Sequence, residues 1–389
     1  MGGAASIGIP HRLLGGRSSP AALAAWHQFD LQLTTYAALL AALGLAMAYS
    51  NSVEAGRSLG EASPLFLRAV LWTSIAVVVF VGLTTFDHRW LRTFTWPLYF
   101  AGLGLLGLTL ALGEGVGGAA RWISVGPVAF QFSEVAKILM IVVLASYLAG
   151  RRGRLGSLPS ILGAVVLVVP AWILVMLQPD LGTSLVFGAL LAGMLFMSGA
   201  SLRWLAALAG IVAAGVPIAW TYLLRDYQKA RLISFLDPAA DVHGPGYQLY
   251  QAQIAIRSGG WVGKGLTNGT QGQLDYLPVQ ATDFVYALLA EELGFIGGIL
   301  VLVLFAALLW RVLVAGWRSP DAFGTLFCCG VASMILFQVV VNIGMVIGVM
   351  PITGIPLPFV THGGASLVTT AAGLGIIQSI NTRRAQAAW

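Results

Sequence analysis

The 389-residue chain is 58% hydrophobic and only 9% charged, with a net charge of +6 and a mean hydropathy of +0.85. Soluble globular domains carry about 25% charged residues, so this composition excludes a soluble protein. The basic residues lie in short segments between apolar runs, where they set membrane orientation, and we expect no nucleic-acid partner.

Ten apolar segments recur along the chain, and each is long enough to cross a bilayer. They cover 31–50, 65–85, 94–112, 132–149, 159–177, 181–199, 203–223, 284–310, 321–350 and 364–381. Their continuous apolar character favours helices, because the strands of a membrane barrel alternate in polarity. The sequence therefore predicts an all-α polytopic membrane protein with a transmembrane domain at 31–381, an N-terminal segment at 1–30 and a tail at 382–389.

The arginines between the spans predict the orientation of the chain. The short loops of one side hold Arg12, Arg17, Arg89, Arg92, Arg151, Arg152, Arg154, Arg203, Arg311, Arg318, Arg383 and Arg384. The opposite short loops hold only Arg57 and Arg121. Because cytoplasmic loops are enriched in Lys and Arg, both termini are predicted to be cytoplasmic. The long loop at 224–282, between the seventh and eighth spans, is then extracytoplasmic.

Five polar stretches fall on this outer side, although they lie far apart in the sequence. They cover 117–137, 178–184, 226–238, 244–283 and 348–366. A site built from loops on a helical scaffold has this organisation. We therefore expect the functional site at the outer face.

Several ionisable residues lie at the ends of spans, where a charge is costly and often functional. Asp283 and Thr282 open the eighth span, and Asp180 precedes the sixth, so each aspartate could cap a helix or carry chemistry. Glu134 and Lys137 are three residues apart and can pair on one helix face, in a structural or a chemical role. Two further carboxylates, Glu291 and Glu292, are interpreted as structural or pathway residues.

The long loop carries basic residues that suggest an anionic ligand. Lys229 and Arg231, with Arg121 across the site, could hold phosphates through charge-assisted hydrogen bonds. The alternative is contact with lipid headgroups. Within 244–260, Tyr247, Tyr250 and Ile254 recur at helical spacing, as expected of an amphipathic helix on the outer leaflet.

The stretch PITGIPLPF, at 351–359, contains three prolines and is followed by HGGAS. Such backbone cannot face lipid and must line protein or a water-filled cavity. We expect a rigid re-entrant loop that forms one wall of the site, with Pro356, His362, Gly363 and Gly364 as supporting residues.

Four long motifs resemble those of a known protein family. RWISVG and FQFSEVAK (121–137) resemble RWI-x-LG and FQPSE-x-AK, and QPDLGT (178–183) is the same as the family's motif. The run from GYQLYQAQIAIRSGGW to LAEELG (246–294) resembles a long signature ending in LPE-x-HTDFIFAVLAEE-x-G. GVMPITGIPLPFVTHGGAS (348–366) resembles PVTGIPLPF followed by SYGGSS. The chain thus resembles the SEDS family, typified by RodA, FtsW and SpoVE, over nearly its whole length, and GTQGQL favours the RodA branch.

The resemblance implies a peptidoglycan glycosyltransferase of the bacterial cytoplasmic (inner) membrane. Such enzymes polymerise lipid II, a disaccharide-pentapeptide on undecaprenyl pyrophosphate, at the outer face, usually with a class B penicillin-binding protein. The family's essential aspartate falls on Asp283, its QPD aspartate on Asp180, its RW arginine on Arg121, and its SE-x-AK pair on Glu134 and Lys137. The implied role of Asp283 is that of general base in an inverting transfer during cell elongation.

Some residues depart from the family pattern. Ala281 stands where histidine is usual, Val279 where glutamate is usual, and Thr361-His362 where Ser-Tyr is usual. The family's histidine beside the aspartate is therefore absent from this sequence.

The ligands expected for this reaction follow from the leaving group. Arg121, Lys137, Lys229 and Arg231 are the predicted cations for the pyrophosphate, with Asp180 and Thr282 as further substrate contacts. No cofactor is required, although a divalent cation (Mg²⁺ or Mn²⁺) held by Asp180 and the pyrophosphate would suit the chemistry.

Three different functions fit the same composition. A lipid II flippase or transporter would place its key charges near the membrane midplane, whereas here they lie at the outer edge. The second is a division-specific, FtsW-like polymerase, and the third is a non-catalytic scaffold for the transpeptidase.

Overall fold

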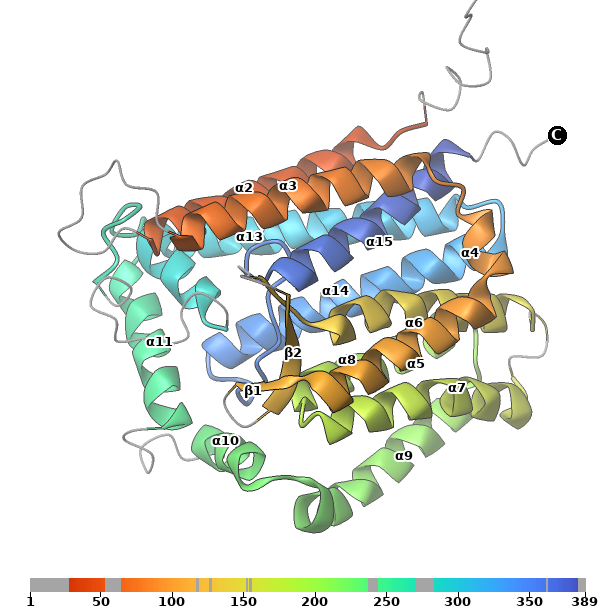
Figure 1. The fold of residues 1–389 in the computed structure, drawn as a ribbon. Helices are drawn as coiled ribbons and strands as arrows, with labels where there is room; N and C mark the ends of the chain where they lie inside the picture. Colours follow the sequence, from red (N-terminus) through yellow and green to blue (C-terminus); the bar gives the residue numbers. More distant parts are fainter. Residues whose placement is uncertain are drawn as a thin grey trace, which may run out of the picture.

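The computed structural model describes residues 28–52, 64–116, 119–125, 128–151, 153, 156–236, 244–270, 283–361 and 363–383. Each of the ten predicted spans is helical in it. The helices form one bundle with their long axes roughly aligned (Figure 1). They are α2 (Leu31–Ser50), α3 (Pro64–Thr85), α5 (Thr95–Leu112), α6 (Phe132–Ala149), α7 (Leu158–Leu177), α8 (Leu181–Met197), α9 (Leu202–Ile218) with the π-turn η1 (Ala219–Leu223), α13 (Val285–Trp317), α14 (Ala322–Val346) and α15 (Gly364–Thr382).

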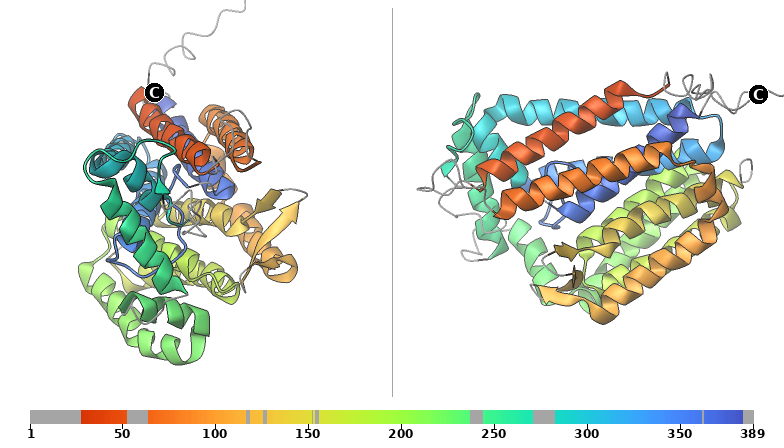
Figure 2. Two further views of the ribbon diagram at one scale, coloured as in Figure 1. Left: turned by 90° about the vertical axis from the view of Figure 1, so that its left-hand side faces the viewer. Right: turned by 45° about the horizontal axis from the view of Figure 1, so that its top comes forward.

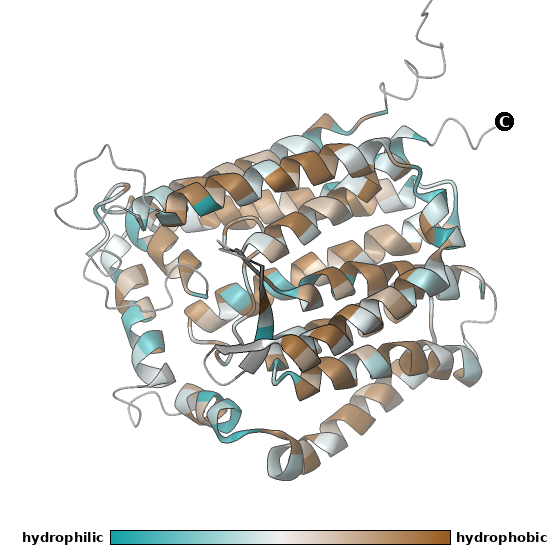
Figure 3. Cartoon of the chain, in the orientation of Figure 1, coloured by the Kyte–Doolittle hydropathy of each residue, from teal (hydrophilic) through white to brown (hydrophobic). Residues whose placement is uncertain are grey.

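The character of these helices confirms the prediction of an all-α polytopic membrane protein. Eight helices in the described part of the chain are long and apolar enough to cross a membrane, and α8 is a shorter apolar helix. Hydrophobic residues run along the long helices, and hydrophilic ones gather toward the two ends of the bundle (Figure 3).

The core lies around α6 and α14, whose most apolar windows are 67% and 78% buried. Glycines allow the close packing of α15 on α3 that Figure 2 shows. A Cβ on Gly375 would lie 2.7 Å from the Phe80 carbonyl oxygen, and one on Gly364 would overlap the Trp72 ring. Small residues at helix contacts commonly permit such close approach in membranes.

The first span begins at the same end of the bundle at which the last span ends. Asp30 caps α2 by accepting from the Leu33 amide at 3.0 Å, and Arg311 of α13 donates to its carboxylate at 2.6 Å. Gln378 of α15 donates to the Asp30 carbonyl at 2.7 Å. This agrees with predicted termini on one side of the membrane, and the identity of that side stays a prediction.

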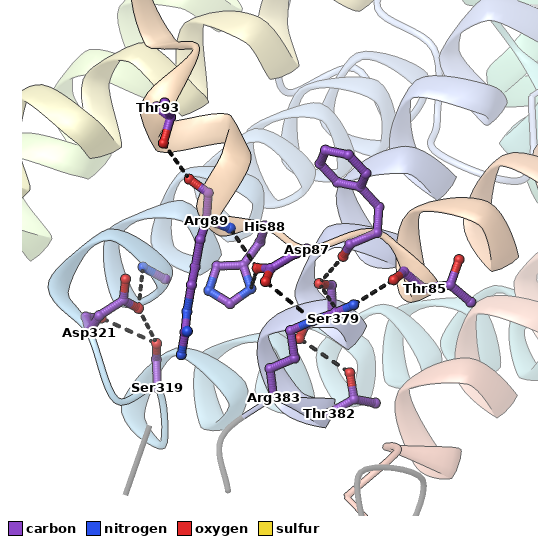
Figure 4. A network of polar contacts seen from close by, with 12 residues as sticks. Thr85, Asp87, His88, Arg89, Thr93, Ser319, Asp321, Ser379, Thr382 and Arg383 are labelled. Carbon is purple, nitrogen blue, oxygen red and sulfur yellow. Dashed lines mark hydrogen bonds and ion pairs between the residues drawn. The ribbon is translucent and has the colours of Figure 1, made fainter. Parts of the chain in front are cut away.

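A polar network at the same end joins α3, α15 and the short helix α4 (Arg89–Thr93) (Figure 4). Arg383 donates to Ser379 Oγ at 2.8 Å, and its Nε lies 3.9 Å from an Asp87 oxygen. His88 is 3% exposed. Burial lowers the pKa of His88, and the Asp321 and Asp87 carboxylates offset part of that effect. The network therefore holds these elements together beside a buried imidazole.

Sequence analysis did not foresee a small sheet between α5 and α6. Strands β1 (Glu114–Val116), β2 (Ala119–Val125) and β3 (Val128–Phe130) pair antiparallel in the order β1-β2-β3. The sheet lies outside the spanning helices, at the end of the bundle opposite the start of α2 (Figure 1). The sheet thereby brings Arg121, on β2, to this end of the bundle. We call this end the mouth.

Two helices occupy the long loop between the seventh and eighth spans, α10 (Asp226–Leu236) and α11 (Pro245–Gly259). The helix predicted within 244–260 is present as α11, and its contact with the outer leaflet stays a prediction. Its buried face carries Leu249, Ala252 and Ala255, whereas Tyr250 is 55% exposed. The missing side chain of Gly259 lets α11 approach α13, since a Cβ there would lie 2.1 Å from the Ala290 carbonyl oxygen.

The eighth span is broken, which the continuous apolar pattern did not predict. Gly294, inside α13, adopts φ 69° and ψ −168°, a conformation essentially restricted to glycine. A Cβ on Gly294 would lie 2.3 Å from the Gly263 amide nitrogen. The residues before the break form a short helix, 285–293, that starts directly after Asp283.

Replacing Gly294 with alanine is expected to destabilise the chain. The backbone conformation alone costs about 1–3 kcal/mol for a non-glycine residue, and the added methyl group must displace backbone at 263. Thermal unfolding of the purified protein should show a clear fall in melting temperature. Gly107→Ala is the matched control, because a Cβ there meets no atom within 4 Å. Equal melting temperatures for the two variants would contradict the strain at the break.

Candidate active site

Asp283 lies in the turn that precedes α13, and α14 holds that turn in place. The Nδ2 group of Asn342 donates to the Asp283 carbonyl at 3.1 Å and to the Ile355 carbonyl at 2.8 Å. Asn342 is fully buried. One amide therefore joins the turn of Asp283 to the proline-rich loop 351–361. Sequence analysis missed Asn342, although a lone amide inside an apolar span was an available signal.

Gly354, in the proline-rich loop, lies close to the side chains of both Asp283 and Arg231. Its φ of +72° places it in the left-handed region, and a Cβ there would lie 3.5 Å from both Arg231 Nη1 and Asp283 Oδ2. The guanidinium and the carboxylate are therefore no farther apart than twice that distance. A cation from the long loop and the predicted base thus flank one glycine at the mouth of the bundle.

Asp180 caps α8, as predicted for one of its two roles. Its carboxylate accepts from the Thr183 amide at 3.1 Å, from Thr183 Oγ1 at 2.8 Å and from Gln131 Nε2 at 2.9 Å. Arg121 Nη1 lies 3.5 Å from the same carboxylate. Asp180 therefore joins α8, β2 and the start of α6 in addition to capping its helix.

A small pocket beside Asp180 brings several predicted ligands together. It is lined by Arg121, Pro179, Tyr227, Gln228, Arg231 and Thr353, among others. The Arg231 guanidinium lies 5.9 Å from the centre of the Tyr227 ring, and the Tyr227 hydroxyl donates to the Pro179 carbonyl. Helix α10 thereby places Arg231 on the same pocket as Arg121, where both can meet one anionic group.

The remaining predicted residues lie in different surroundings. Lys229 is half-buried on α10 and does not line this pocket, and Pro356 lies in the loop 351–361. Gly363 caps α15, and Gly364 packs on Trp72. Four positions named in the sequence analysis, Thr282, His362, Val279 and Ala281, lie outside the described residues.

Glu134 and Lys137 form a buried ion pair on α6. The Lys137 ammonium lies 2.8 Å from each carboxylate oxygen, and the two side chains are 4% and 1% exposed. This geometry favours the structural one of the two predicted roles. Contact of Lys137 with a substrate pyrophosphate stays a prediction.

Glu291 and Glu292 fix the far end of the short helix that begins after Asp283. Glu291 accepts from Lys264 Nζ at 2.6 Å and from the Thr270 amide at 2.9 Å. Ser50 of α2 donates to Glu292 and accepts from the Thr267 amide at 3.2 Å. These two carboxylates anchor the segment 264–270, so Asp283 is the acidic residue of this stretch that lies at the mouth.

The surroundings of the Asp180 carboxylate do not fit a divalent cation, because hydrogen-bond donors already occupy both of its oxygens. Oδ1 faces the Thr183 amide and Arg121, and Oδ2 accepts from Gln131 and the Thr183 hydroxyl. A hard cation prefers carboxylate oxygens with free lone pairs. We therefore assign no step of the reaction to a metal at Asp180.

Residues 30–386 match the model of the FtsW/RodA/SpoVE family, described as cell cycle protein. The chain belongs to this family. The match confirms the SEDS resemblance drawn from the four motifs and covers all ten spans.

Curated relatives of this SEDS chain agree with the predicted enzyme class. Peptidoglycan glycosyltransferase MrdB of Escherichia coli K12 is 38% identical over 359 residues, which are 92% of this chain and 95% of MrdB. A probable peptidoglycan glycosyltransferase FtsW of Nitrosococcus halophilus is 38% identical over 91% of this chain and 92% of its own. Stage V sporulation protein E of Bacillus subtilis is 36% identical over 90% and 96%. The names of the first two confirm the predicted class, peptidoglycan glycosyltransferase.

Solved structures confirm the polytopic helical fold. RodA of Thermus thermophilus, a rod shape determining protein, superposes with a TM-score of 0.68 at 30% identity, over 92% of this chain and 98% of RodA. A chain from a peptidoglycan synthase complex, described for coordination of polymerization and crosslinking, superposes with a TM-score of 0.76 at 32% identity, over 92% and 99%. This SEDS chain is thus a multi-pass membrane protein.

Proposed function

We propose that this chain polymerises lipid II into glycan strands, with Asp283 as the general base. The observation that carries the proposal is the approach of Asp283 and Arg231 to Gly354 from two segments far apart in sequence. A carboxylate and a guanidinium at one position suit a reaction that removes a proton and releases an anion.

The chemistry proceeds as one displacement. Asp283 takes the proton from the acceptor sugar hydroxyl as its oxygen attacks the anomeric carbon of the donor. The new glycosidic bond forms while the bond from that carbon to the pyrophosphate oxygen breaks, and undecaprenyl pyrophosphate leaves with the bonding electrons. Attack opposite the leaving group inverts the anomeric centre, so no covalent enzyme intermediate is needed. Arg231 and Arg121 stabilise the charge that develops on the pyrophosphate.

We place this reaction at the outer face of the bacterial inner membrane. The arginine distribution supports that orientation, because the mouth with Asp283 lies opposite the end of Arg311 and Arg383. A class B penicillin-binding protein is the proposed partner, supported by the similarity to a chain of a peptidoglycan synthase complex.

A role in cell elongation is proposed from the similarity to MrdB and RodA. The equal identity to an FtsW, 38%, keeps a division role as the alternative. A lipid II flippase is the competing activity. Its charges should line a path through the membrane midplane, whereas the cluster proposed here lies at one mouth of the bundle.

Incubation of the purified full chain with lipid II tests the proposal and separates a polymerase from a flippase and from a scaffold. A polymerase gives glycan strands of increasing length, which gel electrophoresis resolves. A flippase in vesicles moves lipid II between leaflets and gives no polymer, and a scaffold does neither. Transbilayer movement of lipid II without any polymer would overturn the proposal.

A further inference from the structure

A polar pocket lies at the opposite end of the bundle from Asp283, between the start of α2 and the end of α13. It has a volume of about 400 Å³ and is open on one side. Ligand pockets of proteins commonly measure about 300–1,000 Å³. Its polar lining consists of Gln28, Asp30, Gln32, Arg311, Arg318 and Asn381.

The charges of this pocket leave one cation unmatched. Arg311 donates through both Nε and Nη2 to Asp30 Oδ2, at 2.9 and 2.6 Å, so these two charges cancel. Arg318 is exposed and makes no ion pair with any residue in the part of the chain that the structure describes. It is the C-cap of α13, seven residues after Arg311, and lines the same pocket. The pocket therefore has a net charge of +1.

The position of the pocket along α13 corresponds to a membrane interface. Trp310 and Trp317 each directly precede one of the two arginines and are 66% and 90% exposed. Exposed tryptophans near the end of a spanning helix lie at the level of lipid headgroups. A ligand of this pocket is thus at the depth of the headgroups.

The pocket also contains an acceptor for a neutral hydrogen-bond donor of a ligand. The Oε1 atom of Gln28 is buried and accepts no hydrogen bond from a described residue. Because Gln28 lines the pocket, rotation of its amide would let this oxygen accept from a hydroxyl group of a bound molecule. The preceding residues 1–27 contain Arg12 and Arg17 and no Asp or Glu, so this segment of the chain has the wrong charge for the pocket.

We infer that this pocket binds the headgroup of phosphatidylglycerol. The phosphodiester carries a single negative charge, which pairs with the cation Arg318. The glycerol hydroxyls supply hydrogen-bond donors for Gln28. Basic pockets between spanning helices hold anionic headgroups on the cytoplasmic side of membrane proteins. The lipid links α2 to the far end of the helix whose other end follows Asp283.

Native mass spectrometry of the full chain, purified from equal mixtures of phosphatidylglycerol and phosphatidylcholine, tests this inference. The wild-type chain should retain phosphatidylglycerol in preference to phosphatidylcholine. Arg318→Gln should weaken that retention about fivefold, and Arg318→Lys should restore most of it. Arg92→Gln is the matched control. Arg92 is exposed at the same end of the bundle and lies on α4, away from the pocket.

Three results would overturn the inference. They are no lipid preference in the wild-type chain, an equal loss in Arg92→Gln, and displacement of the lipid by millimolar glycerol 3-phosphate. The last would identify a soluble phosphate as the ligand. Thermal unfolding shows whether Arg318→Gln is folded. If Arg318→Gln is not folded, retention of phosphatidylglycerol by Arg318→Lys still tests the inference, because lysine keeps the positive charge.

Discussion

Replacing Lys137 with methionine is expected to destabilise the chain by about 3–5 kcal/mol, because it leaves the Glu134 carboxylate buried without its partner. The two side chains are 1% and 4% exposed, and the ammonium is 2.8 Å from both carboxylate oxygens. Water therefore cannot replace the lost ammonium. Thermal unfolding of the purified variant measures the effect as a fall in melting temperature.

A double variant separates structure from chemistry at this pair. Lys137→Met combined with Glu134→Leu removes both charges and should recover most of the stability, since apolar replacements of buried ion pairs are often neutral or stabilising. Lys137→Met with an unchanged melting temperature and no polymer would show that the lysine serves the reaction directly. That result would contradict the structural role given to it here.

Replacing Asp283 with asparagine is expected to reduce polymerisation of lipid II by about 10²–10⁴-fold, the contribution of a positioned acid or base. Asparagine keeps the size of the side chain but cannot take the proton of the attacking hydroxyl. The backbone carbonyl, to which Asn342 donates at 3.1 Å, is unchanged. The variant should therefore insert in the membrane and fold as the wild type does. Its polymerisation rate with purified lipid II measures the effect.

Asp226→Asn is the matched control for Asp283→Asn. Asp226 is exposed at the start of α10, in the same long loop that carries Arg231, and lines none of the site. The control removes the same charge from the same side of the bundle and should polymerise at the wild-type rate. Equal losses in both variants would show that net charge at the mouth matters, rather than a base at 283.

The ten spans could be predicted because each is a continuous apolar run bounded by polar or basic residues. Local chemistry also predicted the helix cap at Asp180 and the helix α11, because both depend on residues close together in sequence. The location of a site at the mouth followed from the number of spans between its segments. An even number of crossings returns the chain to the same side.

The break at Gly294 could not be predicted, because its cause is tertiary. A glycine inside an apolar run usually reflects close helix packing, and nothing nearby in sequence marks it as strained. The segment around Gly263 makes the break necessary by lying against it. The sheet that carries Arg121 was missed for a similar reason: its strands are short, and only their pairing distinguishes them from a loop.

The arrangement around Gly354 was only partly predictable. Sequence placed Asp283, Arg231 and the proline-rich loop on one side of the membrane. Their approach to one glycine depends on its positive φ and on Asn342, which joins two backbone segments. A lone amide in an apolar span is a weaker sequence signal than a charge, although a buried amide has the same need for partners.

Purified Asp283→Asn, assayed for lipid II binding and for polymer on the same sample, gives the most direct test of the central claim. We predict that the variant binds lipid II as tightly as the wild-type chain and forms no strands above background. Strand formation at the wild-type rate would contradict the assignment of the proton to this carboxylate. Loss of both binding and activity would show that Asp283 binds lipid II rather than taking the proton.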